Sequence, residues 1–252
     1  MATTRTASTA AKKQELMAED MSFLNEFAGA GLENIKQGDQ AVSYLTMIQP
    51  GSSLIDDDNP AGTWRNSATG KNYGEIVRVI PLAFKSIWNE RQSEAPYATI
   101  AKYEPNTIDV EMKNPPAGSR GYPKMINPAT GNEIQELYVY PVILPDHPED
   151  GVLYFNPTVG SMKALRAWNT QLQSQLLDNG ARAPIFAFSW ALCLALVPNP
   201  KKPTEKITKL VKVQKDILCS KDLFVDHVKP QLTIVNKSLL QIASSEDEEA
   251  AE

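Results

Sequence analysis

The sequence predicts one α+β domain that is rich in β-strands and is built on a small barrel. Between Gly31 and about Ile234, most apolar stretches are short and end at turn residues, as strands do. The chain also contains 18 prolines, which interrupt long helices. In addition, two turns of similar composition each lie beside a candidate strand. These observations favour strands joined by hairpins, with only a few helices.

The chain is predicted to have three parts. Residues 1–20 are small and polar without strong periodicity, which indicates a disordered N-terminal arm. Residues 21–242 are expected to form a single domain, and residues 18–27 have enough apolar side chains for a short helix at its start. Residues 243–252 are expected to be a disordered acidic tail.

The first candidate strands are residues 42–49 and residues 73–88. The second of these segments alternates its side chains with the two-residue period of a strand. Pro81 lies inside it and cannot donate a hydrogen bond to a neighbouring strand. We therefore expect this strand to lie at a sheet edge or to carry a bulge at Pro81. Residues 108–112 and 136–143 are shorter candidate strands.

Two turns share Asn, Ala, Thr and Gly at the same spacing. They run from Asn66 to Gly70 and from Asn127 to Gly131. An Asn side chain opens a turn by bonding to nearby backbone, and Gly accepts the positive φ that a bulged hairpin needs. The pattern predicts two similar β-hairpin tips rather than a duplicated domain.

The best helix candidate is residues 161–178, where apolar side chains recur every three or four residues. Ser161 can cap its start and Gly180 can end it. A hairpin of residues 184–197 and 207–218 follows. Its first strand alternates large side chains, which we expect in the core, with small ones on the opposite face. Residues 221–242 are expected to form a second helix, or a strand and a helix, broken near Pro230.

The residue 243–252 tail carries the whole net charge of the chain. That charge is −5, and it comes from five acids: Glu246, Asp247, Glu248, Glu249 and Glu252. Because such a string repels itself and buries no apolar surface, it stays solvated. It can compete for a basic groove of its own protein by mimicking nucleic acid. It can also bind a basic patch on a partner, or serve solubility alone.

Signatures of catalysis are nearly absent. Neither His147 nor His227 has metal-ligand spacing from a Cys or another His, and no P-loop, dinucleotide fingerprint or nucleophile elbow is present. Three successive acids, residues 56–58, could gather a divalent cation, but acids in such a loop are more often solvated. We expect a protein that is not an enzyme and has no cofactor or metal.

Cysteine and hydropathy patterns indicate an intracellular protein outside the membrane. Cys193 and Cys219 are too few for a disulfide framework, which fits a reducing cytosol. The longest apolar run, residues 183–198, is shorter than the roughly 20 residues of a membrane helix.

Residues 201–215 carry six lysines and one acid. Lysines along an extended backbone suit the phosphates of a single nucleic-acid strand, because neutralising phosphates releases counterions. Lysines also protect exposed edge strands from aggregation, so both interpretations stay open at this point.

Aromatic and basic residues interleave over residues 73–91. Bases stack on aromatic rings for about 1–3 kcal/mol each, while cations hold the phosphates. Trp88 is the ring we expect first at the surface and Trp64 is another, although burial is a near-equal alternative for both. Lys163 and Arg166 share one face of the predicted helix, near an N-terminus that favours phosphate.

Three blocks of sequence follow one another in a recognisable order. They are residues 31–35 with 44–50, residues 70–73 running into 77–85 and Trp88, and residues 160–169 with 184–188. Together they resemble a family of bacteriophage single-stranded DNA-binding proteins, over roughly residues 29 to 215. The resemblance implies an OB-like β-barrel with long hairpin elaborations, in the cytoplasm of the infected bacterial host. It also implies a tail that contacts replication proteins such as a polymerase, helicase or nuclease.

From the residues and the resemblance together, we predict sequence-independent binding of single-stranded DNA, which the protein would coat and protect during phage DNA replication, recombination and repair. An alternative is a phage structural or host-interaction protein without DNA binding. The predicted DNA-binding residues are Arg78, Lys85, Trp88, Lys163, Arg166, Lys209, Lys212 and Lys215.

Overall fold

The computed structural model describes residues 42–92, 98–116, 123–157, 159–200, 202–232 and 234–235. The predicted N-terminal arm, the short helix at residues 18–27 and the acidic tail lie outside the described residues. The chain divides into two units, Met1–Ala41 and Val42–Glu252, and the second unit contains every described residue.

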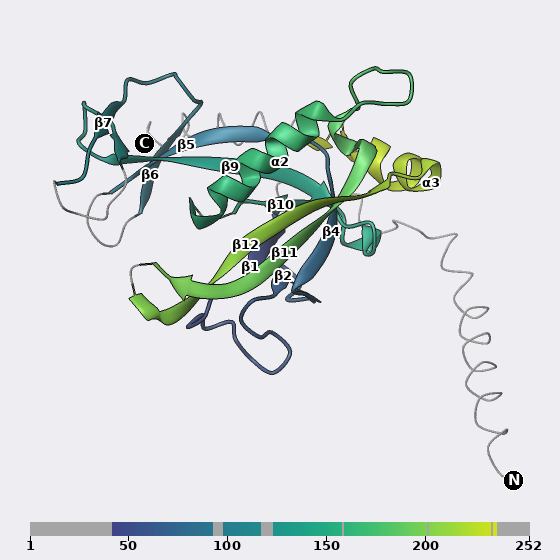
Figure 1. Ribbon diagram of the computed structural model, residues 1–252, viewed down its shortest axis with the longest axis horizontal. Helices are drawn as coiled ribbons and strands as arrows, with labels where there is room; N and C mark the ends of the chain where they lie inside the picture. The colour runs from purple at the N-terminus through teal and green to yellow at the C-terminus, as the bar shows by residue number, and fades with distance from the viewer. Residues whose placement is uncertain are drawn as a thin grey trace, which may run out of the picture. The chain divides into compact units, whose positions relative to one another are not determined.

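Strands dominate the described part of the chain, and twelve of them form one sheet (Figure 1). The strands are β1 Tyr44–Met47, β2 Trp64–Asn66, β3 Asn72–Gly74, β4 Ile76–Pro81, β5 Lys85–Arg91, β6 Thr99–Tyr103, β7 Glu111–Lys113, β8 Lys124–Ile126, β9 Glu133–Ile143, β10 Leu153–Phe155, β11 Phe188–Asn199 and β12 Lys202–Leu218. The helices are α2 Met162–Ser174, α3 Lys221–Leu223 and the π-helical η6 Phe224–Val228, with 3₁₀ turns η3 Pro148–Asp150, η4 Val159–Ser161 and η5 Ile185–Ala187.

The main path of the sheet runs β12-β11-β4-β9-β10-β1-β2-β3. Its pairs are antiparallel except for β1 with β10. The long strand β9 joins two regions, because it also pairs with β5 and β8. The sheet curls like part of a barrel, and in the described residues its pairing does not join β12 to β3. The prediction of a β-rich α+β fold is confirmed.

The segment predicted as one long strand, residues 73–88, is divided among β3, β4 and β5. The predicted bulge at its proline is confirmed. Pro81 lies opposite Val142, whereas Lys85 lies opposite Val139, so this segment has one more residue than β9 between the two pairs. The extra residue lets β4 and β5 bend while both stay paired to the continuous β9.

Both predicted hairpin tips are confirmed. The side-chain Oδ1 of Asn66 accepts a hydrogen bond from the backbone N–H of Ala68 at 2.9 Å, and Asn127 Oδ1 accepts one from Ala129 at 3.0 Å. The glycine that ends each turn has a positive φ, +78° and +74° respectively. The tips connect β2 to β3 and β8 to β9.

The predicted helix is present but shorter than expected, because α2 ends at Ser174. Ser161 does not cap it with its side chain. Its Oγ instead accepts a hydrogen bond from the backbone N–H of Leu210, at 3.4 Å, which ties the helix start to β12. Gly180 lies in the following turn, where its N–H donates to the Leu177 carbonyl.

The predicted break near Pro230 is wrong, since residues 229–232 continue the helical path from α3 and η6. The π-helical turn η6 ends at Val228, two residues before the proline. Its wider spacing relieves the clash that a proline ring makes with the preceding helical turn. Ser220 caps the segment, and its Oγ accepts a hydrogen bond from Leu223 N–H at 3.2 Å.

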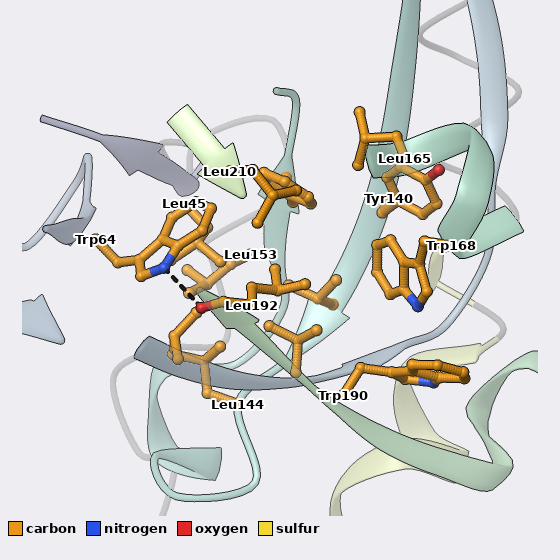
Figure 2. Packing of buried hydrophobic residues seen from close by; sticks show 14 of the residues in the cluster. Leu45, Trp64, Tyr140, Leu144, Leu153, Leu165, Trp168, Trp190, Leu192 and Leu210 are labelled. Carbon is orange, nitrogen blue, oxygen red and sulfur yellow. Dashed lines mark hydrogen bonds between the residues drawn. The ribbon is translucent and has the colours of Figure 1, made fainter. Parts of the chain in front are cut away.

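Both faces of the central sheet are covered. The face that carries Trp190 and Tyr140, called here the inner face, packs against α2 through Leu165 and Trp168 (Figure 2). The opposite face, called the outer face, carries Ile80, Val139 and Ile143 and packs against the C-terminal helical segment, which comprises residues 221–232 and 234–235. Successive side chains along one strand therefore pack alternately into two different cores.

Candidate nucleic-acid interface

Strand β11 separates its side chains as the sequence predicted. Trp190, Leu192 and Leu194 are buried on the inner face, whereas the small residues between them are only half-buried on the outer face. The small residues are Ala191, Cys193 and Ala195. Because their side chains are short, they form a low floor on the outer face between β4 and β12.

Three cationic side chains flank this floor. Residues directly opposite each other in neighbouring strands point to the same face. Arg78 of β4 lies opposite Ala191, while Lys212 and Lys209 of β12 lie opposite Cys193 and Ala195. We call Arg78, Lys209 and Lys212 the basic strip. The strands that carry them lie on either side of β11, about 10 Å apart.

A bulge in β12 allows the two lysines to share a face. Leu194 lies opposite Leu210 and Cys193 lies opposite Lys212, so Val211 is an extra residue in β12. In a regular strand, without a bulge, side chains three positions apart point to opposite faces. The sequence shows the lysines but not the bulge.

The cations of the basic strip differ in their partners. Arg78 Nε donates to Asp146 Oδ2 at 2.8 Å, and its Nη1 lies 3.5 Å from Asp216 Oδ2. The hydrogen bond to Asp146, more than any other contact, raises the pKa of Arg78. Among the described residues, no carboxylate lies within 4.0 Å of Lys209 or Lys212. The lysines therefore provide the uncompensated charge of the strip.

Trp88 is not at the surface, and the prediction of an exposed stacking ring there is wrong. It is 8% exposed, on the inner side of β5, which lies between β6 and β9. Trp64, Trp168 and Trp190 are also buried. The Trp64 indole Nε1 donates to the Leu192 carbonyl at 3.2 Å, the contact drawn in Figure 2.

The remaining predicted site residues lie away from the basic strip. Lys85 is on the outer face of β5 but mostly buried, with its Nζ 3.1 Å from Glu104 Oε1. Lys163 and Arg166 are exposed on α2, which covers the inner face, and Arg166 Nη2 lies 3.1 Å from Glu136 Oε2.

Lys215 is also on the inner face, because it lies opposite Trp190. Its Nζ is 3.6 Å from the centre of the Phe188 ring and donates to Gln175 Oε1 at 2.7 Å. A cation held in this way is not directed toward the strip, so the structure does not bring Lys215 together with Lys209 and Lys212.

One group that the sequence analysis missed brings together three potential metal ligands in the described residues, His147, Glu149 and Asp150. A cation of the protein already lies there, since Lys71 Nζ is 2.9 Å from both carboxylates. The hydrogen bond from Lys71 is also the main reason why the pKa of Glu149 falls to about 2. The arrangement is that of an ion-pair cluster. The spacing of residues in the sequence does not indicate that Lys71 takes part in it, because Lys71 lies far from both acids along the chain.

The aspartates of residues 56–58 do not converge as a cation site would require. Asp56 Oδ1 accepts hydrogen bonds from the backbone N–H groups of Asp58 and Asn59, at 3.0 and 2.7 Å. The side-chain amide of Asn59 adds a further bond, which is the main reason for the lowered pKa of Asp56. This carboxylate therefore shapes its own loop.

The described helices include none that is long and apolar enough to cross a membrane. No curated protein and no solved structure matches the chain. A family model, described as Pam3 phage gp34-like protein, matches residues 11–208, which is more than half of the sequence. The chain therefore belongs to the family of Pam3 phage gp34-like proteins.

Proposed function

We propose that this phage protein binds single-stranded DNA without sequence preference, through the basic strip, and that it is not an enzyme. The observation that carries the proposal is the pair Lys209 and Lys212, which share the outer face and have no carboxylate partner among the described residues. The low floor of β11 beside them lets a sugar-phosphate backbone approach closely.

The chemistry of the strip suits phosphate rather than base recognition. Ammonium groups are point charges that neutralise phosphates whatever the base. The ion pair of Arg78 with Asp146 is solvent-exposed, with 42% and 43% of the two side chains accessible. Because exposed pairs are weak, a phosphate can compete with the aspartate for the guanidinium.

The wider role rests on the resemblance to phage single-stranded DNA-binding proteins. It includes an OB-like barrel, coating of DNA during replication, recombination and repair, and location in the cytoplasm of the infected host. The tail acids Glu246, Asp247, Glu248, Glu249 and Glu252 would compete for the strip when DNA is absent, or recruit replication proteins. Membership of a phage family is compatible with this role.

Charge reversal on the strip tests the proposal. Three phosphate contacts to a single strand predict a slope of log affinity against log salt of about −2, or roughly 20-fold weaker binding at 200 than at 50 mM salt. The Lys209→Glu/Lys212→Glu variant should bind labelled oligothymidylate more weakly. The magnitude of its salt slope should fall below about 1. Fluorescence anisotropy measures both quantities.

A matched control carries the same charge change elsewhere. Lys113 of β7 and Lys163 of α2 are exposed lysines outside the strip. The Lys113→Glu/Lys163→Glu variant should keep the wild-type salt slope. Equal loss in both double variants would show that only total charge matters and would overturn the assignment to β12. A wild-type chain that does not bind would overturn the function itself.

Cysteine alkylation gives a second, independent test. Cys193 is part of the floor of the strip, whereas Cys219 packs against the outer-face core beside the C-terminal helical segment. Bound oligonucleotide should slow alkylation of Cys193 and leave the rate at Cys219 unchanged. Unchanged rates at both cysteines under saturating oligonucleotide would contradict binding over β11.

A second candidate function, protein binding within a phage structure or to a host protein, has its own supporting observation. A pocket of about 400 Å³ is lined mainly by apolar side chains, and its lining residues are Leu176, Leu177, Asp178, Asn179, Phe188 and Leu218. Leu176 and Leu218 are 60% and 62% exposed, an unusual exposure for leucine. Under this alternative, Leu176→Asp would abolish co-purification with phage particles, and oligonucleotide binding would be absent.

A further inference from the structure

A second, smaller cavity lies on the outer face of the sheet, beside β5. Its walls come from β5, β6, β9, β10 and β1, and its volume is about 80 Å³. The lining residues are Tyr44, Ile87, Asn89, Lys102, Leu137, Val139, Tyr154 and Asn156. It is partly enclosed and combines aromatic, aliphatic and polar groups.

The polar group that marks this cavity is the side-chain carbonyl of Asn89. Its Oδ1 atom is buried and accepts no hydrogen bond among the described residues. Most buried polar atoms have a partner, because leaving an acceptor without one is unfavourable. An acceptor in the wall of a cavity, with no protein partner, is available to water or to a ligand that presents an N–H or O–H donor.

The other walls favour a flat, partly apolar ligand. Tyr44 and Tyr154 lie side by side on parallel strands, with ring centres 6.2 Å apart, and Tyr44 is 40% exposed. Ile87 and Leu137 supply aliphatic surface, and Lys102 supplies a cation at the border. Aromatic rings, one hydrogen-bond acceptor and a nearby cation together match a nucleobase attached to a phosphate.

The volume limits how such a ring can enter. One water needs roughly 10–15 Å³, whereas a fully enclosed benzene ring occupies a cavity of about 150 Å³. At about 80 Å³ the cavity admits the edge of a planar ring and leaves the rest outside. The Watson–Crick edge of every base carries an N–H donor, such as N3–H in thymine, that can donate to Asn89 Oδ1, so this contact does not require one particular base.

The cavity and the basic strip share one face of the sheet. Arg78 and Ile80 point to the outer face of β4, and after the bulge Lys85, Ile87 and Asn89 point to the same face of β5. We infer that the cavity is a nucleobase subsite of the single-strand interface. This inference rests on the proposed function, because it assigns one base contact to the strand whose phosphates the strip binds.

The test compares base-dependent and base-independent binding. Wild type and Asn89→Leu are titrated with an oligothymidylate of about 15 nucleotides and with an abasic strand of the same length. We expect Asn89→Leu to bind oligothymidylate about tenfold more weakly, the effect of losing one base contact, and to bind the abasic strand like wild type. The control is Asn114→Leu, the same change at an exposed asparagine that does not line the cavity.

The outcomes separate the two proposals. Because Asn89→Leu removes an unpaired acceptor, it should unfold in urea at no lower concentration than wild type, so a loss of binding would not reflect misfolding. If wild type binds but Asn89→Leu and Asn114→Leu bind oligothymidylate equally, the cavity holds only water and the subsite is refuted while the function stands. If wild type binds neither strand, the function fails and the subsite with it.

Discussion

Replacing Glu90 by Gln tests how much of the stability of this fold depends on one buried carboxylate. Glu90 of β5 is 1% exposed. It accepts hydrogen bonds from Tyr103 Oη at 2.8 Å, Asn127 Nδ2 at 2.9 Å and Asn132 Nδ2 at 2.7 Å, and a further one from the Thr130 hydroxyl. It thereby holds the turn from Asn127 to Gly131 against β5.

The size of the stabilisation by Glu90 follows from the pKa of its carboxylate. Burial raises the pKa of Glu90, but the four hydrogen bonds outweigh burial and lower the pKa from 4.5 to about 2. That difference corresponds to about 3 kcal/mol of stability from the ionised form. Since the folded pKa is the lower one, this contribution is complete above pH 4.5 and is lost as the pH falls toward 2.

Urea unfolding measures this contribution, with the four buried tryptophans reporting the transition. At pH 7, Glu90→Gln should lower the free energy of unfolding by about 3 kcal/mol, because Gln resembles the protonated acid. The difference from wild type should shrink as the pH falls from 4.5 toward 2. Glu111→Gln, at an exposed glutamate of β7, should match wild type throughout. A Glu90→Gln variant within about 0.5 kcal/mol of wild type at pH 7 would show that the ionised carboxylate does not stabilise the fold.

Three further predictions concern the turns and the inner core. Gly70→Ala and Gly131→Ala should each cost about 1–2 kcal/mol because both glycines have positive φ, and the first should cost more because its new Cβ would lie 3.1 Å from Arg65 Nη2; equal urea midpoints for wild type and both variants would contradict this. Trp64→Phe should cost about 1–3 kcal/mol in the same assay, since it leaves the Leu192 carbonyl without its indole donor. Acrylamide should quench the tryptophan fluorescence of the native protein far less than that of the unfolded protein. Strong quenching of the native protein would show that a tryptophan is exposed.

The local features of this fold could be predicted because each depends on neighbouring residues. An Asn side chain and a Gly four positions later suffice for the two hairpin tips, and their geometry is nearly the same in both. The bulge beside Pro81 could be predicted because proline has no backbone N–H to donate to a neighbouring strand. The alternation of large and small side chains in β11 likewise predicted that Trp190, Leu192 and Leu194 enter the core, whereas Leu196, on the same predicted face, is 42% exposed.

The position of the tryptophans could not be predicted in the same way. Trp88 lies among basic and polar neighbours in sequence, and only its pairing between β6 and β9 buries it. Asn89, the next residue, faces a cavity whose walls include β1, β9 and β10, each more than 40 residues away in the sequence. No local pattern marks either outcome, because both depend on which strands become neighbours.

The lysines of β12 show how a single extra residue decides the candidate site. Lys209, Lys212 and Lys215 follow one another at steps of three, and in a regular strand each step of three changes the face. The bulge at Val211 cancels the change between Lys209 and Lys212, whereas no bulge lies between Lys212 and Lys215. The first two lysines therefore share the outer face with Arg78, and the third packs on Phe188. The lysine-rich sequence thus forms a basic strip only where a bulge places neighbouring lysines on the same face of the sheet.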